Sequence, residues 1–285
     1  MNGRTVLITG ASRGLGEHMA KRFWEAGYSL ALVARDEGAL ATVAKSLEKR
    51  DQQICTLLPC DLGSSLEVAK LIADVKAHLS SLDVVIHNAA MHGPIGPLVE
   101  NDLALWNQTM QVNFLSPVAL TQGWIPLMKE HGGGSIIGLS GGGATGPRAN
   151  FSAYASSKAA LVRFCETLSQ ETQSLSIRVN CIAPGAMKTA LLGEVLTQGQ
   201  GAAGEREFGI AHQVFNEGGA SMDQVAKLAL FLASEESIGI TGKLISAIWD
   251  CWEQWPEHLA ELSQSDAYTL RRIAGRERGL DWGDK

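Results

Sequence analysis

A tyrosine and a lysine four positions apart form the first pair of side chains that could carry out acid/base chemistry. Tyr154 and Lys158 lie near the start of a helix predicted over residues 151–172, and an i, i+4 spacing places both side chains on one helix face. A free phenol, with a pKa of about 10, is a poor proton donor near neutral pH. A neighbouring ammonium favours the phenolate and so lowers that pKa. Because any helix surface can carry such a pair, other residues must support this interpretation.

A glycine-rich turn near the N-terminus is the second chemical feature. Thr9-Gly10-Ala11-Ser12-Arg13-Gly14-Leu15-Gly16 follows a buried strand and opens a helix. Glycines permit a tight turn and a close backbone approach, and the unpaired N–H groups of a helix start attract a pyrophosphate. An ordinary βα turn is the alternative, but the position directly after a first strand is the context that a dinucleotide site requires. The sequence predicts phosphate contacts from Gly10, Ser12, Arg13, Gly14, Leu15 and Gly16.

The end of the second predicted strand indicates which dinucleotide is bound. A carboxylate there would hold both ribose hydroxyls of NAD, but the chain has Arg35 at this place and Asp36 after it. Arg13 and Arg35 together could grip a 2′-phosphate through charge-assisted hydrogen bonds. NADP(H) is therefore favoured over NAD(H). Asp36 would approach the ribose only if the register shifted; otherwise it starts the following helix, where a carboxylate suits the helix dipole.

The pattern that must position these residues alternates short apolar runs with longer amphipathic stretches. Strands buried on both faces are predicted at residues 5–8, 29–33, 54–58, 84–86, 135–139 and 177–182. Helices are predicted at about 14–26, 36–50, 64–79, 102–130, 151–172 and 221–233. This series predicts an α/β fold, a doubly wound parallel sheet of the Rossmann type in a single domain.

Two regions interrupt this rhythm. Residues 186–220 contain a Gly/Gln-rich stretch and are predicted to form a mobile excursion, a substrate loop, within a domain of residues 1–246. Residues 247–285 form an extension too rich in tryptophan to be disordered. Trp249, Trp252 and Trp255 are expected to pack over the substrate end or a neighbouring subunit, or else on the chain's own surface. Arg148 and Phe151 could face the substrate, with Arg148 then suggesting an anionic group; a solvated loop arginine is the alternative.

Taken together, the motifs resemble the short-chain dehydrogenase/reductase family over about residues 4–246. The resemblance rests on motifs in the family's order: Thr9 to Gly16, His87-Asn88-Ala89-Ala90, Asn113, Ser140, Tyr154 with Lys158, and Pro184-Gly185 with Thr189.

That resemblance implies a role for each matching residue. Tyr154 would be the acid/base, Lys158 would bind the nicotinamide ribose, Ser140 would hold the substrate oxygen, and Asn113 would hold a water that passes protons to Lys158. The remaining cofactor contacts implied are Asp61 and Leu62 at the adenine, Asn88 and Ala89 beside the cofactor, and Pro184, Gly185 and Thr189 at the nicotinamide. The family also suggests a homodimer or homotetramer that uses helices 102–130 and 151–172 as contact surfaces.

Three positions depart from the family's pattern. Ala90 stands where a glycine is usual, and the strand at residues 241–246 is followed by Ala247-Ile248-Trp249-Asp250 in place of Asp-Gly-Gly. Ser140 precedes Tyr154 by 14 residues, one more than usual, so the usual serine position is Gly141. Either the glycines at 141–143 absorb the extra residue and Ser140 still reaches the substrate, which we favour, or the serine role is degraded.

Amino-acid composition limits which molecules the protein is expected to bind and where it is expected to be found. With 24 Lys plus Arg against 30 Asp plus Glu and no basic run, a nucleic-acid partner is not expected. No apolar stretch approaches the roughly 20 residues that span a bilayer, and the N-terminus shows no signal peptide, so a cytoplasmic protein is expected. The five cysteines are scattered, as in a reducing compartment, and no Cys/His spacing indicates a metal site. His87 and His92 are interpreted as structural.

The predicted function is hydride transfer between NADP(H) and a small-molecule carbonyl or secondary alcohol. An NADP(H)-binding regulatory protein that has lost turnover is the alternative, supported by the displaced serine and opposed by Tyr154, Lys158 and Asn113.

Overall fold

The parallel sheet at the centre of the molecule has inner strands that are largely buried on both faces and edge strands that are partly exposed. In the computed structural model, which describes residues 3–50, 52–280 and 282, seven strands among the described residues pair in the order β3-β2-β1-β4-β5-β6-β7, all parallel. Their bounds are β1 Thr5–Thr9, β2 Ser29–Ala34, β3 Cys55–Pro59, β4 Val84–His87, β5 Gly134–Leu139, β6 Ile177–Ala183 and β7 Leu244–Ser246. The order reverses between β1 and β4, so the doubly wound Rossmann-type prediction is confirmed.

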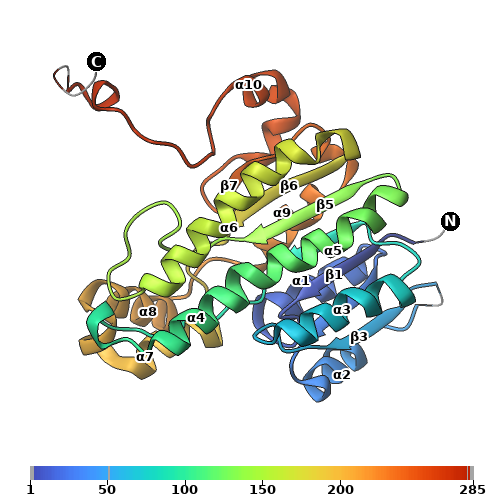
Figure 1. Ribbon diagram of the computed structural model, residues 1–285, viewed down its shortest axis with the longest axis horizontal. Coiled ribbons are helices and arrows are strands. Elements are labelled where there is room, and N and C mark those ends of the chain that lie inside the picture. The colour runs from blue at the N-terminus through green and yellow to red at the C-terminus, as the bar shows by residue number, and fades with distance from the viewer. Residues whose placement is uncertain (1–2, 51, 281, 283–285) are drawn as a thin grey trace.

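Helices cover the two faces of this sheet in two groups (Figure 1). The apolar residues of α1 (Gly14–Glu25), α2 (Glu37–Ser46) and α9 (Met222–Ala233) share one core cluster with one face of the sheet. Those of α3 (Ser65–His78), α5 (Ser116–Glu130) and α6 (Ser152–Glu171) share a second cluster on the other face. Each helix follows its strand by the right-handed crossover that parallel pairing requires, which brings the carboxyl ends of all strands to one edge.

The helix predicted over residues 102–130 is interrupted in its middle. It consists of α4 (Leu103–Met110), a π-helical turn at Gln111–Leu115 and α5. Such a turn is rare and widens the helix by one residue, which frees backbone groups at that point. Asn113 lies inside it and is buried.

Residues 186–220, predicted as a mobile excursion, contain two helices. α7 spans Ala190–Ala203 and α8 spans Glu205–Glu217, and Figure 1 shows both beyond the carboxyl edge of the sheet. The glycines interpreted as loop formers instead kink and separate the helices: Gly199 has φ +81° within α7, and Gly204, with φ +83°, divides α7 from α8. Apolar residues of both helices then pack with Phe151 and Tyr154 in a third cluster.

The C-terminal extension is ordered and joins the core. A 3₁₀ segment at Trp252–His258 precedes the short helix α10 (Leu259–Gln264), and Trp252 and Trp255 are buried in the cluster that contains α9. Trp249 and Trp282 are exposed. The division of the chain at residue 246 stays a prediction.

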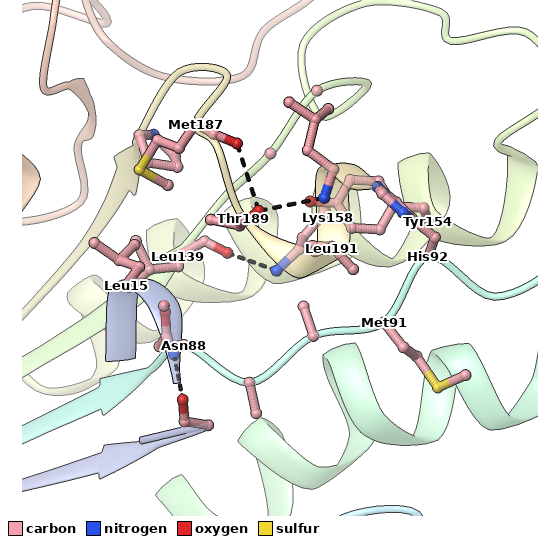
Figure 2. Close-up of a pocket in the computed structure, with 18 of the residues that line it drawn as sticks. Leu15, Asn88, Met91, His92, Leu139, Tyr154, Lys158, Met187, Thr189 and Leu191 are labelled. Atoms are coloured by element: carbon pink, nitrogen blue, oxygen red, sulfur yellow. Dashed lines mark hydrogen bonds between the residues drawn. The ribbon is translucent and has the colours of Figure 1, made fainter. Parts of the chain in front are cut away.

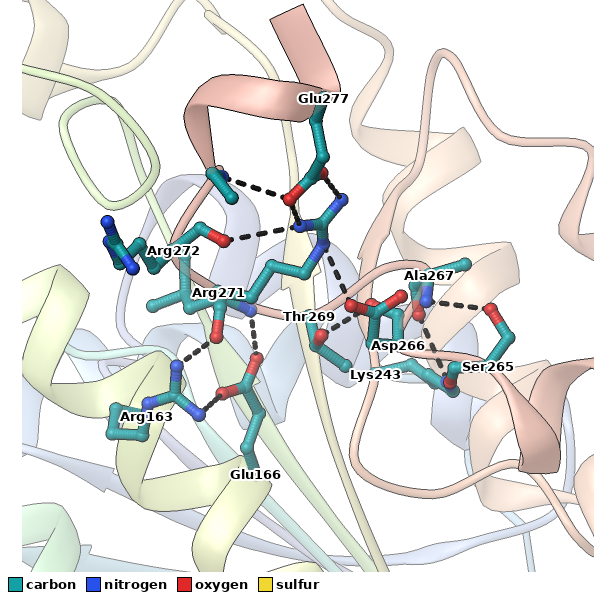
Figure 3. Close-up of polar contacts among 12 residues, drawn as sticks. Arg163, Glu166, Lys243, Ser265, Asp266, Ala267, Thr269, Arg271, Arg272 and Glu277 are labelled. Atoms are coloured by element: carbon teal, nitrogen blue, oxygen red, sulfur yellow. Dashed lines mark hydrogen bonds and ion pairs between the residues drawn. The ribbon is translucent and has the colours of Figure 1, made fainter. Parts of the chain in front are cut away.

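Hydrogen bonds hold the segment after α10 against the rest of the domain. Figure 3 shows Glu166 of α6 accepting the Leu270 N–H at 2.6 Å and Lys243 donating to the carbonyls of Ser265 and Ala267 at 3.0 Å each. Arg271 then pairs with Asp266 and Glu277. Beyond this anchor the chain runs away from the body (Figure 1).

Candidate active site

A cleft of about 1670 Å³ lies along the carboxyl edge of the sheet and is closed on one side by α7 and α8. Ligand pockets commonly measure 300–1,000 Å³, so this cleft has room for a dinucleotide and a second molecule. The predicted site residues that line it are Gly10, Ser12, Arg13, Gly14, Leu15, Gly16, Arg35, Asp61, Leu62, Asn88, Ala89, Ser140, Tyr154, Lys158, Pro184, Gly185 and Thr189. Of the predicted set, Asn113 alone lies behind the lining, in the π-helical turn.

The glycine turn between β1 and α1 has the geometry of a backbone cradle. Gly10 and Gly14 have φ of +67° and +57°, and a Cβ on Gly16 would lie 2.1 Å from the Gly10 carbonyl oxygen. Asn88, which Figure 2 shows with one of these bonds, fixes this turn from the end of β4, because its amide donates to the carbonyls of Thr9 at 2.9 Å and Gly10 at 3.2 Å. No side chain caps the start of α1 among the described residues. These features fit the pyrophosphate of a dinucleotide.

The adenosine end of the cleft carries two arginines without a carboxylate partner in the described chain. Arg13 and Arg35 are both exposed, both line the cleft and make no ion pair with the described residues. Asp36 accepts the Ala39 N–H at 3.0 Å as the N-cap of α2 and also lines the cleft. Asp61 accepts the Gly63 N–H at 2.9 Å and lines the cleft.

Tyr154 and Lys158 lie on the same face of α6 and both are buried. The Lys158 Nζ lies 5.7 Å from the centroid of the Tyr154 ring and donates to the Leu139 carbonyl at 2.8 Å (Figure 2). Burial lowers the pKa of Lys158 to about 8, since an ammonium loses hydration there. Two of its three N–H donors remain for a ligand in the cleft.

In the chain without cofactor, the pKa of the Tyr154 phenol differs from the prediction. Burial raises the pKa of Tyr154, and the charge that opposes this rise is the guanidinium of Arg148. Lys158 was expected to lower the pKa, but its ammonium already donates to the Leu139 carbonyl. A positively charged group brought into the cleft would add to the effect of Arg148.

Asn113 acts on the site through neighbouring groups. Its side chain pairs with the Met91 backbone in both directions, at 2.9 Å and 2.8 Å, and donates to the Ser157 hydroxyl at 3.0 Å. Ser157 in turn donates to the Tyr154 carbonyl at 2.7 Å. The amide therefore connects the π-helical turn to α6 and to the loop after β4. Among the described residues, no hydrogen bond joins Asn113 directly to Lys158.

The glycine after Ser140 packs directly against the phenol. A Cβ on Gly141 would lie 2.3 Å from the Tyr154 hydroxyl oxygen, so this position admits no side chain while the tyrosine keeps its place. Ser140 is held at the end of β5 by its N–H, which donates to the Ile182 carbonyl at 2.8 Å. Its side chain is nearly buried, lines the cleft and makes no hydrogen bond with the described residues. A role for Ser140 towards a substrate oxygen stays a prediction.

Sequence reasoning missed two ion pairs beside Tyr154, in which carboxylates of α7 and α8 meet His92 and Arg148. The His92 ring lies edge-on to the Tyr154 ring at 4.8 Å, and its Nδ1 is 3.3 Å from a Glu194 oxygen on α7. Burial lowers the pKa of His92. Arg148 pairs with Glu207 of α8 at 2.7 Å, a contact between residues far apart in sequence that no local pattern indicates.

His87 is buried against the Thr121 hydroxyl at 2.8 Å, and burial lowers its pKa to about 3, which agrees with a structural role. Within the described residues, no group of three His, Cys, Asp or Glu side chains is placed to hold a metal ion. In the same part of the chain, none of the helices has the length and apolarity to cross a bilayer.

Comparison with known proteins supplies the family. The sequence model for short chain dehydrogenases matches residues 4–200. An oxidoreductase of Escherichia coli K12, YciK, is 35% identical over 196 residues, which are 67% of this chain and 76% of YciK. The human dehydrogenase/reductase SDR family member 4 is 28% identical over 85% of each chain.

Solved structures give the same result. The crystal structure of YciK from Escherichia coli superposes with a TM-score of 0.74 at 29% identity, covering 87% of this chain and 96% of that one. A short chain dehydrogenase from Shigella flexneri 2a, complexed with NADP, superposes with a TM-score of 0.72 at 28% identity, covering 87% and 98%. The chain therefore belongs to the short-chain dehydrogenase/reductase family of oxidoreductases.

Proposed function

We propose that the chain transfers a hydride between NADP(H) and a carbonyl or secondary alcohol carbon, with Tyr154 as the acid/base. The observation that carries the proposal is a buried phenol that lines the same cleft as an open backbone cradle for a pyrophosphate. A nicotinamide dinucleotide, when bound, supplies or accepts the hydride.

The preference for NADP(H) is supported by charge. Arg13 and Arg35 line the cleft at its adenosine end, while the nearby Asp36 is engaged as a helix cap. Two guanidinium groups favour a 2′-phosphate over a ribose hydroxyl pair. The NADP complex of the Shigella flexneri relative agrees with this choice.

Each buried group then has a part in proton movement. In the reducing direction Tyr154 donates its hydroxyl proton to the substrate oxygen as negative charge develops there. Lys158 has two N–H donors that make no hydrogen bond within the described chain. With these it holds the nicotinamide ribose, and it returns a proton to the phenolate. Ser140 donates to the substrate oxygen from the end of β5. Asn113 orders the π-helical turn through which a water would reach Lys158.

The direct experiment follows nicotinamide absorbance with ketones, aldehydes and alcohols. NADPH oxidation or NADP⁺ reduction with a member of the panel is expected. Tyr154→Phe should lower kcat by about 10²- to 10⁴-fold, the usual contribution of a general acid, and leave the Kd for NADPH within about twofold. Tyr268→Phe, which keeps its ring contact with Trp255, is the matched control and should behave as wild type.

Two outcomes would contradict the proposal. Substantial turnover in Tyr154→Phe would exclude the phenol as acid/base. Tight NADPH binding without turnover on any compound would instead indicate a cofactor-binding regulatory protein.

Ser140→Ala separates the two interpretations of the shifted serine: a loss of about 10²-fold in kcat supports a contact with the substrate oxygen, and a loss below threefold shows that the serine role is degraded.

A further inference from the structure

The ion pair between Arg148 and Glu207 lies inside the cleft, next to the proposed acid/base. The Arg148 Nε donates to Glu207 at 2.7 Å, and the two side chains are only 10% and 15% exposed. The guanidinium carbon lies 3.8 Å from the centroid of the Phe151 ring and 5.4 Å from that of Tyr154. A cation that faces the phenol is therefore already neutralised by a carboxylate of α8 and fixed by an aromatic ring.

Lys158, beside the phenol, is assigned to the nicotinamide ribose, and two further basic side chains on this side of the cleft are engaged by the chain itself. His92 faces Glu194, and burial lowers its pKa, so it is neutral near pH 7. Lys188 donates to the Phe215 carbonyl at 3.1 Å and lies over that ring. Arg206 is the exception: it is exposed at the first turn of α8.

The surfaces around the phenol are otherwise apolar. Tyr154 belongs to a cluster with Phe151 and Val195, against which Leu191 and Leu192 of α7 pack. Figure 2 shows Leu191 on the α7 side of the cleft, close to Lys158 and Tyr154. Trp249 also lines the cleft and keeps 84% of its surface exposed. Apolar surface of this size in a cleft gains free energy when a ligand covers it.

We infer that the cleft takes an uncharged carbonyl or alcohol substrate with an apolar body, and that Glu207 determines this specificity by neutralising Arg148. The inference rests on the proposed function for the reaction itself. A substrate carboxylate beside Arg148 would meet the negative charge of Glu207 and would compete with it for the guanidinium, and both effects oppose binding.

Two compounds that differ in charge and by one methyl group test this specificity: methyl benzoylformate and benzoylformate. For wild type, kcat/KM with the ester should exceed that with the acid by about tenfold or more, the factor expected for an unpaired charge in a partly dehydrated site. Glu207→Gln keeps the size and an acceptor oxygen but frees the positive charge of Arg148. It should shift the ester-to-acid ratio by about tenfold towards the acid.

A matched control makes the same chemical change away from the cleft. Glu277→Gln alters an ion pair with Arg271 in the C-terminal segment and should leave the ratio unchanged. The inference is overturned if wild type prefers the acid, or if Glu207→Gln changes the ratio by less than twofold while its near-ultraviolet circular dichroism matches wild type.

A double variant covers the case in which Glu207→Gln does not fold. Arg148→Met with Glu207→Leu replaces the pair by apolar side chains, a change that buried ion pairs often tolerate. Its ester-to-acid ratio should stay within about threefold of wild type. Selective loss of turnover with the acid would show that Arg148 holds the carboxylate in wild type and would overturn the inference.

Binding without turnover separates this inference from the proposed function. With NADP⁺ bound no ketone can be reduced, and calorimetric titration with each compound then measures affinity alone. Tighter binding of the ester supports the inference even if NADPH is never oxidised. Tighter binding of the acid, or no binding of the ester up to its solubility limit, overturns it even if both compounds are reduced.

Discussion

The two ends of the cleft are built from different parts of the chain. At the phosphate end, one turn of eight residues supplies the cradle, and Gly10, Gly14 and Gly16 shape it through their backbone. At the substrate end, side chains from the loop after β4, the loop before α6, and helices α7 and α8 meet around Tyr154, as in the pairs Arg148–Glu207 and His92–Glu194.

This difference distinguishes the part of the cleft that all members of the family can share from the part that is particular to one member. Backbone N–H groups of a helix start bind any pyrophosphate in the same way, so the turn can serve every member. The pairs at the substrate end require particular side chains on separate helices, and each can change without disturbing the sheet. Variants at the two ends should therefore fail in different ways.

The largest effect is expected at the phosphate end. In Gly16→Ala the added Cβ would lie 2.1 Å from the Gly10 carbonyl oxygen, so the turn must shift. We expect the Kd for NADPH to rise about a hundredfold, as for an overpacked site. Gly201→Ala in α7, where a Cβ meets nothing within 4 Å, is the control. Fluorescence titration measures both, and a change below twofold in Gly16→Ala would refute the cradle.

Lys158→Met tests the buried ammonium between the two ends. Burial lowers the pKa of Lys158 from 10.5 to about 8. Between these values the unfolded chain holds a proton that the folded chain has released, so wild-type stability should rise with pH across this window. The free energy of unfolding of wild type relative to Lys158→Met should therefore increase by about 3 kcal/mol from pH 8 to 10.5. Denaturant unfolding at several pH values measures it; a flat difference would contradict the shifted pKa.

Arg35→Ala tests the cofactor preference. Loss of a guanidinium that meets the 2′-phosphate should weaken NADPH binding about tenfold and leave NADH binding unchanged, with a smaller effect at high salt. Arg278→Ala, an exposed arginine in the C-terminal segment, is the control. Equal losses for both dinucleotides would place Arg35 away from the 2′ position.

The smallest effect is expected at the mouth of the substrate end. Trp249 and Trp282 are 84% and 85% exposed, but only Trp249 lines the cleft. Trp249→Ala should raise KM for an apolar ketone about fivefold, equivalent to about 1 kcal/mol of lost apolar burial, with little change in kcat. Trp282→Ala should change neither. Identical kinetics for the two variants would show that the indole does not meet the substrate.

Local sequence pattern predicted the sheet, its helices and the phosphate end. The apolar runs gave β1 to β6 to within about one residue at each end, because strands buried on both faces need little context. The pattern missed α7 and α8, since Gly199 and Gly204 resemble loop formers until their packing on Phe151 and Tyr154 is known. The pattern also did not indicate Glu207 and Glu194 as partners of Arg148 and His92, because each pair joins residues that only the folded chain brings together.

The ionisation of Tyr154 tests the account most directly. The chain has three tyrosines, so the difference in ultraviolet absorbance between wild type and Tyr154→Phe during a pH titration isolates this phenol. Without cofactor the pKa should lie above 10.0, because burial raises it. With NADP⁺ bound it should fall, because the nicotinamide charge joins that of Arg148 in favouring the phenolate. A pKa that is the same with and without NADP⁺ would contradict the assignment of Tyr154 as the acid/base.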